Sequence, residues 1–283
     1  MDRRCLKYCL TPAERRSFNR NGYLIVRDAL PKARVRKLIK ATERVDVKTR
    51  KVERIGPDER VHTREFLGED QAFIDLIAYP RLLPKVWGIL GWNIHIYLAH
   101  LDVTPIEPPD SKRGVGLGWH QDTGRVNQEM ETRPRPRLSV KVAYFLSDTS
   151  EPGRGNFHVI PGSQLKDKMT FPRGDRKRMV NGGVPILAPK GSAVIFDRRL
   201  WHSARANYWT EPRKVAFYGY GYRWLQARGP CDVGKFWEKM DPIERQLCRN
   251  PPSDVHGWTS PKDEDVPLKG WIEKNVKNGL VGP

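Results

Sequence analysis

The chain contains few cysteines and no long apolar run. Its 283 residues include four cysteines, at positions 5, 9, 231 and 248, whose spacings match no common zinc or redox motif. No apolar run approaches the roughly 18 residues that a membrane-spanning helix needs. The basic N-terminus also lacks the apolar core of a secretory signal. These features argue against a disulfide-rich secreted scaffold and a helical membrane protein. We expect a reduced, cytoplasmic setting without a membrane span.

Acidic residues are scarce relative to basic ones. The chain has 33 Asp and Glu against 51 Lys and Arg, which gives a formal net charge of +18. Such an excess predicts a positive surface potential that attracts anions. The anion could be nucleic acid, a membrane headgroup or an acidic small molecule. A solvated basic surface without a ligand is the other interpretation.

The remaining composition is that of a folded domain. Hydrophobic residues make up 38% of the chain and aromatics 10%, which is enough for a sizeable core. No internal repeat or low-complexity segment is present. We expect a single domain over 1–283. Its parts are a helical N-terminal region over 10–90, a β core over 91–225 and a C-terminal extension over 226–283.

The N-terminal region carries helix signals. Thr11 precedes Pro12, and Glu14 follows three residues after Thr11, which is the pattern of a capping box with proline in the first turn. Asn21-Gly22 predicts the end of this helix. We expect a strand over 23–26, a second helix from Pro31 and a helical stretch over 72–90 that Pro80 and Pro84 interrupt.

The middle of the chain reads as strands separated by turns. In 138–145, one set of alternate residues is Leu138, Val140, Val142 and Tyr144. Similar runs occur over 93–103, 157–160, 192–196 and 214–222. Because no regular helices separate these runs, the pattern favours an antiparallel sandwich or barrel over a parallel sheet.

Two residues in Trp119-His120-Gln121-Asp122 could share a metal ion. In an extended chain, side chains two residues apart point to the same side, so His120 and Asp122 can reach one ion while Gln121 points elsewhere. A mixed nitrogen and carboxylate pair suits a borderline ion such as Fe(II). The pair alone is weak evidence, since a chain of this composition is nearly expected to contain one such match.

His202 is the candidate third ligand. It follows the predicted strand over 192–196 after a short turn, a position where functional residues often lie. Two histidines and one carboxylate form the facial triad of non-haem Fe(II) oxygenases, which leaves open coordination positions. Arg213 lies eleven residues after His202 and opens the next predicted strand. Its guanidinium could bind a carboxylate through two parallel hydrogen bonds.

Several motifs occur together in the order typical of one family. They are 10–14 with 21–26, the tetrapeptide 119–122, the segment 155–163, and Trp201-His202-Ser203 with Asn207 and Arg213. Over roughly residues 10–225 the chain resembles the phytanoyl-CoA dioxygenase family of Fe(II)- and 2-oxoglutarate-dependent oxygenases.

The resemblance implies a fold and a set of ligands. The implied fold is a mainly β, cupin-like jelly roll with flanking helices, the double-stranded β-helix. It implies Fe(II) bound by His120, Asp122 and His202, with 2-oxoglutarate and O₂ as co-substrates. The candidate cofactor contacts are Arg213, His100 and Gln121, and the candidate substrate contacts are Arg125, Lys141 and Tyr144. Lys141 and Tyr144 occupy one strand and are equal candidates here.

The resemblance also implies an activity. The carboxylate ligand Asp122 argues against halogenation and for hydroxylation or a related oxidation, with succinate and CO₂ as co-products. We expect a small anionic substrate, such as a carboxylate, phosphate, phosphonate, nucleotide or CoA thioester. The basic residues near the motifs are Lys112, Arg113, Arg125, Arg133, Arg135, Arg137, Lys141, Arg198, Arg199 and Arg205.

Two alternatives belong to other classes. The net charge and the basic stretch over 173–178 are compatible with nucleic-acid binding, but no recognition helix, zinc finger or aromatic RNA-binding motif accompanies them. The other alternative is a non-catalytic binding protein on the same fold. The intact His-Asp-His set argues against it.

Overall fold

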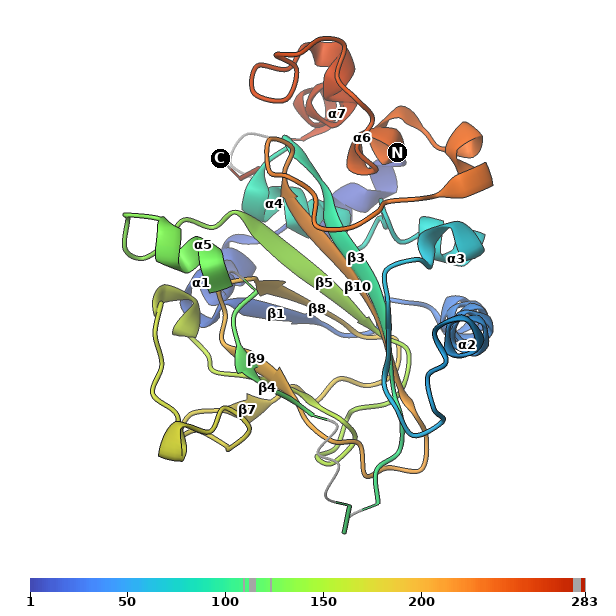
Figure 1. Ribbon diagram of the computed structural model, residues 1–283. Helices are drawn as coiled ribbons and strands as arrows, with labels where there is room; N and C mark the ends of the chain where they lie inside the picture. Colours follow the sequence, from blue (N-terminus) through green and yellow to red (C-terminus); the bar gives the residue numbers. More distant parts are fainter. Residues whose placement is uncertain (109, 112–115, 123, 277–280, 283) are drawn as a thin grey trace.

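Two antiparallel sheets form the centre of the molecule (Figure 1). A computed structural model describes residues 1–108, 110–111, 116–122, 124–276 and 281–282. A six-stranded sheet has the order β1-β8-β5-β10-β3-β2, and a four-stranded sheet has the order β4-β9-β6-β7. This arrangement with flanking helices confirms the predicted double-stranded β-helix.

The strands of the larger sheet include most of the predicted ones. They are β1 (Tyr23–Val26), β8 (Ala193–Asp197), β5 (Ser139–Phe145), β10 (Arg213–Tyr222), β3 (Ile94–Thr104) and β2 (Val61–Thr63). The smaller sheet consists of β4 (Leu117–His120), β9 (His202–Ala204), β6 (Phe157–Val159) and β7 (Val184–Pro185). Short β2, β4, β7 and β9 were not predicted as separate strands, since runs of two to four residues carry little periodic signal.

The helices lie outside the sheets. They are α1 (Pro12–Asn21), α2 (Lys32–Glu53), α3 (Gln71–Ile74), α4 (Leu83–Leu90), α5 (Gly124–Glu129), α6 (Pro242–Leu247) and α7 (Pro267–Asn275). Short 3₁₀ turns are η1 (Arg3–Tyr8), η2 (Leu67–Glu69), η3 (Ser163–Leu165), η4 (Pro172–Gly174), η5 (Gly234–Lys239) and η6 (Asp263–Asp265). Within the described residues, no helix is both long and apolar enough to cross a membrane.

The helix signals near the N-terminus are confirmed. The Thr11 side chain accepts a hydrogen bond from the Glu14 backbone N–H, and the Glu14 carboxylate accepts one from the Thr11 N–H. Gly22 ends α1 in the left-handed region, with φ of 82°, where a side chain would also collide with Gln164. The stretch over 72–90 is interrupted between α3 and α4, where Pro80 lies, but Pro84 lies in the first turn of α4 and does not interrupt it.

Each face of the larger sheet packs against a different apolar layer. Val140, Val142 and Tyr144 of β5 join the large core under the helices. Ala143 and Phe145 of the same strand join a second cluster with Phe157 and other residues between the two sheets. The space between the sheets therefore has rigid walls, and the candidate site lies there.

The C-terminal region packs against the rest of the chain. The side-chain amide of Gln246 in α6 donates to the backbone carbonyls of Trp92 and Ile94. The Trp271 indole N–H of α7 donates to the carbonyl of Met1. Figure 1 accordingly shows α6 and α7 close to the N-terminus and beyond one end of the larger sheet.

Candidate metal and co-substrate site

Three predicted ligands from separate parts of the chain meet between the sheets. His120 ends β4, His202 opens β9, and the two are paired across these strands. Their ring centroids lie 4.2 Å apart, and His202 Nε2 is 3.9 Å from Asp122 Oδ2. One ligand atom from each of His120, Asp122 and His202 lies within 4.8 Å of the others. This spacing allows one ion to contact all three.

The hydrogen bonds of the two histidines suit metal binding. His120 Nδ1 lies 2.8 Å from the carbonyl of Gly118, and His202 Nδ1 lies 2.8 Å from the carbonyl of Leu200. A carbonyl only accepts, so each Nδ1 carries the hydrogen and each Nε2 keeps a free lone pair. Burial lowers the pKa of both rings, that of His202 to about 3, so both are neutral at pH 7. Neutral imidazoles with an orienting hydrogen bond are what a divalent ion requires.

A buried lysine balances the carboxylate of Asp122. Lys141 Nζ, on β5, lies 2.9 Å from Asp122 Oδ2. Burial alone would raise the pKa of the Asp122 carboxyl, but Lys141 and the two histidines hold it well below its usual range. The carboxylate is therefore ionised and able to bind a cation. The sequence did not decide whether Lys141 or Tyr144 faces the site. In the structure, Lys141 faces it.

Arg213 and His100 border the same cavity as the three ligands. This inner cavity has a volume of about 190 Å³. Arg213 is buried, and its Nε finds no hydrogen-bond partner among the described residues. Burial lowers the pKa of its guanidinium to about 10, so it stays cationic at neutral pH. His100 stacks on Phe217 with ring centroids 4.5 Å apart. The cavity thus offers a buried cation beside an apolar wall.

Three further polar residues line this cavity and were not predicted as site residues. His62 of β2 is exposed, and its Nδ1 lies 2.7 Å from Asp102 Oδ1. Arg60 forms an ion pair with the other oxygen of Asp102. Only Asp102's alternation with His100 along β3 could have indicated its position, since β2 is too short to be recognised.

His62, His100 and Asp102 form a second group with metal-ligand spacing. Both oxygens of Asp102 already have partners, in His62 and Arg60. Arg213 also acts on Asp102 electrostatically, since the carboxylate raises the pKa of the guanidinium. Two nearby guanidinium groups oppose a further cation. The group is better described as an ionic network that surrounds the inner cavity than as a second metal centre.

Two predicted contacts are corrected by the structure. Tyr144 faces the large core beneath the helices, and its hydroxyl donates to the carbonyl of Leu76. The Gln121 amide donates to the backbone carbonyls of Lys166 and Arg199. Both side chains hold elements together and neither lines the inner cavity. The reason is alternation, since residues of opposite parity on one strand face opposite sides.

The other predicted basic residues have diverse partners. Lys112 and Arg113 lie outside the described residues. Arg125 is exposed and pairs with Glu129 at 2.6 Å. Arg137 and Arg199 both pair with Asp197. Arg198 has no such pair among the residues that the structure describes, and it lines a cavity of about 440 Å³ beside Asp122.

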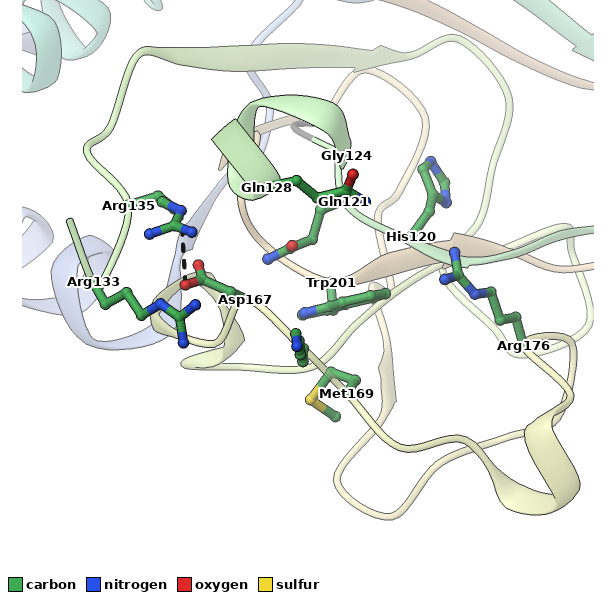
Figure 2. A pocket seen from close by; sticks show the side chains of 11 residues that line it. His120, Gln121, Gly124, Gln128, Arg133, Arg135, Asp167, Met169, Arg176 and Trp201 are labelled. Carbon is green, nitrogen blue, oxygen red and sulfur yellow. Dashed lines mark ion pairs between the residues drawn. The ribbon is translucent and has the colours of Figure 1, made fainter. Parts of the chain in front are cut away.

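A larger cavity of about 510 Å³ borders His120 on another side. Figure 2 shows Arg133 and Arg135 near Asp167 on one side of it, Arg176 on the other, and Trp201 between them. Arg135 Nε is 4.0 Å from Asp167 Oδ2. Arg176 lies over the Phe171 ring, 5.6 Å from its centroid. Arg135 and Arg176 therefore already have partners in Asp167 and the Phe171 ring.

Comparisons with known proteins agree with this geometry. A family model described as phytanoyl-CoA dioxygenase (PhyH) matches residues 18–215. No curated protein matches the sequence significantly.

Among solved structures, HygX from Streptomyces hygroscopicus has a similar fold. Its complex with nickel and 2-oxoglutarate is 18% identical, covers 77% of this chain and 90% of its own, and has a TM-score of 0.61. The iron-bound form gives 18% identity, the same coverage of this chain, 89% of its own and a TM-score of 0.59. The complex with nickel, 2-oxoglutarate and hygromycin B is 15% identical, covers 77% and 90%, and also has a TM-score of 0.59.

Proposed function

Because the chain belongs to the phytanoyl-CoA dioxygenase family and is a 2-oxoglutarate-dependent non-haem iron oxygenase, we propose that it hydroxylates a small anionic metabolite at the His120, Asp122 and His202 site. The observation that carries the proposal is the convergence of these three side chains with Arg213 on one cavity. In the overall reaction, one oxygen atom of O₂ enters the substrate and the other enters succinate as CO₂ is released.

The proposed roles follow from the contacts of each side chain. His120, Asp122 and His202 would hold Fe(II), which when bound supplies the oxidising chemistry. Arg213 would bind the distal carboxylate of 2-oxoglutarate through its planar guanidinium, because it is buried and its Nε–H has no partner among the described residues. His100 and Phe217 form the wall beside it and keep water away.

Positive charge around the cavities supports an anionic substrate. The inner cavity is lined by Arg60, Arg64, Lys141, Arg213 and Arg228 against Asp102 and Asp122. Positive charge within low-dielectric walls raises the local concentration of anions. We retain Lys141 as a substrate-facing candidate, and Arg125 as one at the rim.

Anaerobic titration tests the proposed site. Fe(II) and then 2-oxoglutarate are added to the protein, and the visible charge-transfer band of the chelated keto acid is recorded. We expect the band in the wild type and its loss in His202→Ala. Arg213→Gln should keep metal binding but raise the 2-oxoglutarate concentration for half-maximal signal roughly 10- to 100-fold, since a charged hydrogen-bond pair is lost.

His62→Ala serves as the matched control. It removes a histidine of the same cavity that is outside the proposed ligand set. A wild type without the band, or an unchanged band in His202→Ala, would refute the site. If His62→Ala lost the band as fully as His202→Ala, the band would not be specific to the proposed ligand set of His120, Asp122 and His202.

A further inference from the structure

One buried cation next to the proposed metal site lacks a counter-ion. Arg198 follows β8 and is 5% exposed. Its guanidinium makes no hydrogen bond or ion pair with any described residue, and it lies over the Tyr97 ring, 5.7 Å from the centroid. A buried charge without a partner is costly. The site is therefore suited to a ligand of opposite charge.

The carboxylates nearby are already neutralised by other cations. The two carboxylates that act on Arg198 electrostatically are Asp122, which pairs with Lys141 at 2.9 Å, and Asp197, which pairs with Arg137 at 2.8 Å and with Arg199 at 2.7 Å. Both carboxylates are shared with other cations, and neither forms an ion pair with Arg198 in the described part of the chain. The positive charge of Arg198 is thus available to a molecule from solution.

A second guanidinium shares this cavity. Arg228 lines both the inner cavity and the 440 Å³ cavity, which we call the Asp122 cavity. Its Nη1 donates to the backbone carbonyl of Asp122 at 3.4 Å, while the Asp122 N–H donates to the carbonyl of Arg198 at 3.0 Å. The two arginines therefore flank the residue that would bind the metal. Burial lowers the pKa of Arg198, and the proximity of Arg228 lowers it further, whereas Tyr97 and Asp122 raise it.

We propose that the Asp122 cavity binds a phosphoryl or phosphonyl group of the substrate between Arg198 and Arg228. This inference rests on the proposed function and specifies its substrate. Two guanidiniums match the charge and the several acceptor oxygens of a tetrahedral dianion. Because the Arg228 guanidinium contacts the backbone carbonyl of Asp122, and both arginines line the cavity beside this metal ligand, the oxidised carbon lies within a few bonds of this group. Long substrates whose anionic group is far from the reacting carbon do not fit.

The larger cavity of Figure 2 is a weaker anion site. Arg135 faces Asp167, and Arg176 packs over aromatic rings. It borders the proposed metal site only through His120. The Asp122 cavity combines an unpaired buried cation with a direct connection to the inner cavity through Arg228.

Phosphorus NMR on the loaded protein tests the inference. The probe is methylphosphonate, added to Co(II)-loaded protein with 2-oxoglutarate bound, and the measured quantity is the ³¹P relaxation rate. Paramagnetic cobalt should accelerate relaxation in the wild type, and Zn(II)-loaded protein gives the diamagnetic baseline. Arg228→Gln should weaken probe binding about tenfold or more. Arg198→Lys should weaken it as well, because lysine keeps the charge but loses the fork.

Controls separate this inference from the proposed function. Arg16→Gln removes an equal charge from the exposed surface of α1 and should behave like the wild type. Arg228 is exposed, so Arg228→Gln remains informative if Arg198→Lys fails to fold.

The outcomes are distinct. Wild-type protein that fails to bind 2-oxoglutarate would refute the proposed function. Protein that binds 2-oxoglutarate but shows no ³¹P enhancement, or the same enhancement in Arg228→Gln, would overturn this inference alone.

Discussion

At the scale of single residues, burial of neutral histidines makes the fold sensitive to acid. His95 of β3 is 2% exposed, and burial, with Arg249 and Arg223, lowers its pKa to about 4 from the usual 6.5. The unfolded chain therefore binds a proton below pH 6.5 that the folded chain binds only near pH 4. Stability contributed by neutral His95 is present above pH 6.5 and is lost as the pH falls through this window.

His95→Gln should reduce this acid sensitivity. The shift corresponds to at most about 3–4 kcal/mol between pH 6.5 and 4, at roughly 1.36 kcal/mol per pH unit. We expect the free energy of unfolding from urea titrations to fall less steeply in the variant than in the wild type over this range. The exposed His256→Gln should keep the wild-type slope. Parallel slopes for His95→Gln and the wild type would contradict the assignment.

At the scale of elements, β5 assigns different functions to its two faces. Lys141 contacts Asp122 between the sheets, whereas Tyr144 packs beneath the helices. A cation at 2.9 Å from a ligand carboxylate competes with a metal ion for it. Lys141→Met should therefore bind Ni²⁺ several-fold more tightly in equilibrium dialysis. Tyr144→Phe, on the same strand, should leave the affinity unchanged. Weaker Ni²⁺ binding by Lys141→Met would show that the lysine supports the site.

The same strand shows what the sequence could and could not predict. Its bounds were predicted to within two residues, as alternation and turn signals allow. Both of its faces are buried, so apolar and polar residues do not distinguish the inner face from the outer one. His120, Asp122, His202 and Arg213 were predicted to gather because motif order carries information beyond local pattern.

Other contacts depended on tertiary structure. The network of His62 with Asp102 joins β2 to β3, and β2 has only three residues. Arg198 forms no ion pair with Asp197 because Arg137 and Arg199 already pair with that carboxylate. Neither the His62–Asp102 contact nor the ion pairing around Arg198 can be predicted from spacing along the chain. Of two adjacent arginines, Arg199 pairs with Asp197 and Arg198 has no ion pair among the described residues, a difference that depends on the fold.

At the scale of the whole molecule, the excess positive charge is not uniform in its effect. On the exposed face of α2, Arg44 pairs with Asp70 and Lys48 with Glu69. Such exposed pairs contribute little and are screened by salt. The basic groups near Asp122 lie instead in cavities of low dielectric, where their charge acts strongly on a ligand. The net charge of +18 therefore matters less for function than where a few buried guanidiniums lie.

A buried amide helps to join the C-terminal region to the core. Gln246 donates to the carbonyls of Trp92 at 3.0 Å and Ile94 at 3.2 Å and accepts from the Leu268 N–H at 3.0 Å. Gln246→Leu would remove these three hydrogen bonds, at about 1–3 kcal/mol for each group left without a partner, although the Trp92 carbonyl keeps its bond from the Ile94 N–H. We expect a loss of about 2–5 kcal/mol in the free energy of unfolding and a lower Tm.

Metal binding should be unaffected in the same variant, because Gln246 lies outside both candidate metal clusters and the inner cavity. Gln226→Leu, the same substitution at an exposed position, is the matched control and should leave the stability near that of the wild type. If Gln246→Leu unfolds at the wild-type denaturant concentration, residues 226–283 are not a cooperative part of the fold. A stability loss with unchanged Ni²⁺ affinity would instead show that this region supports the β core without shaping its site.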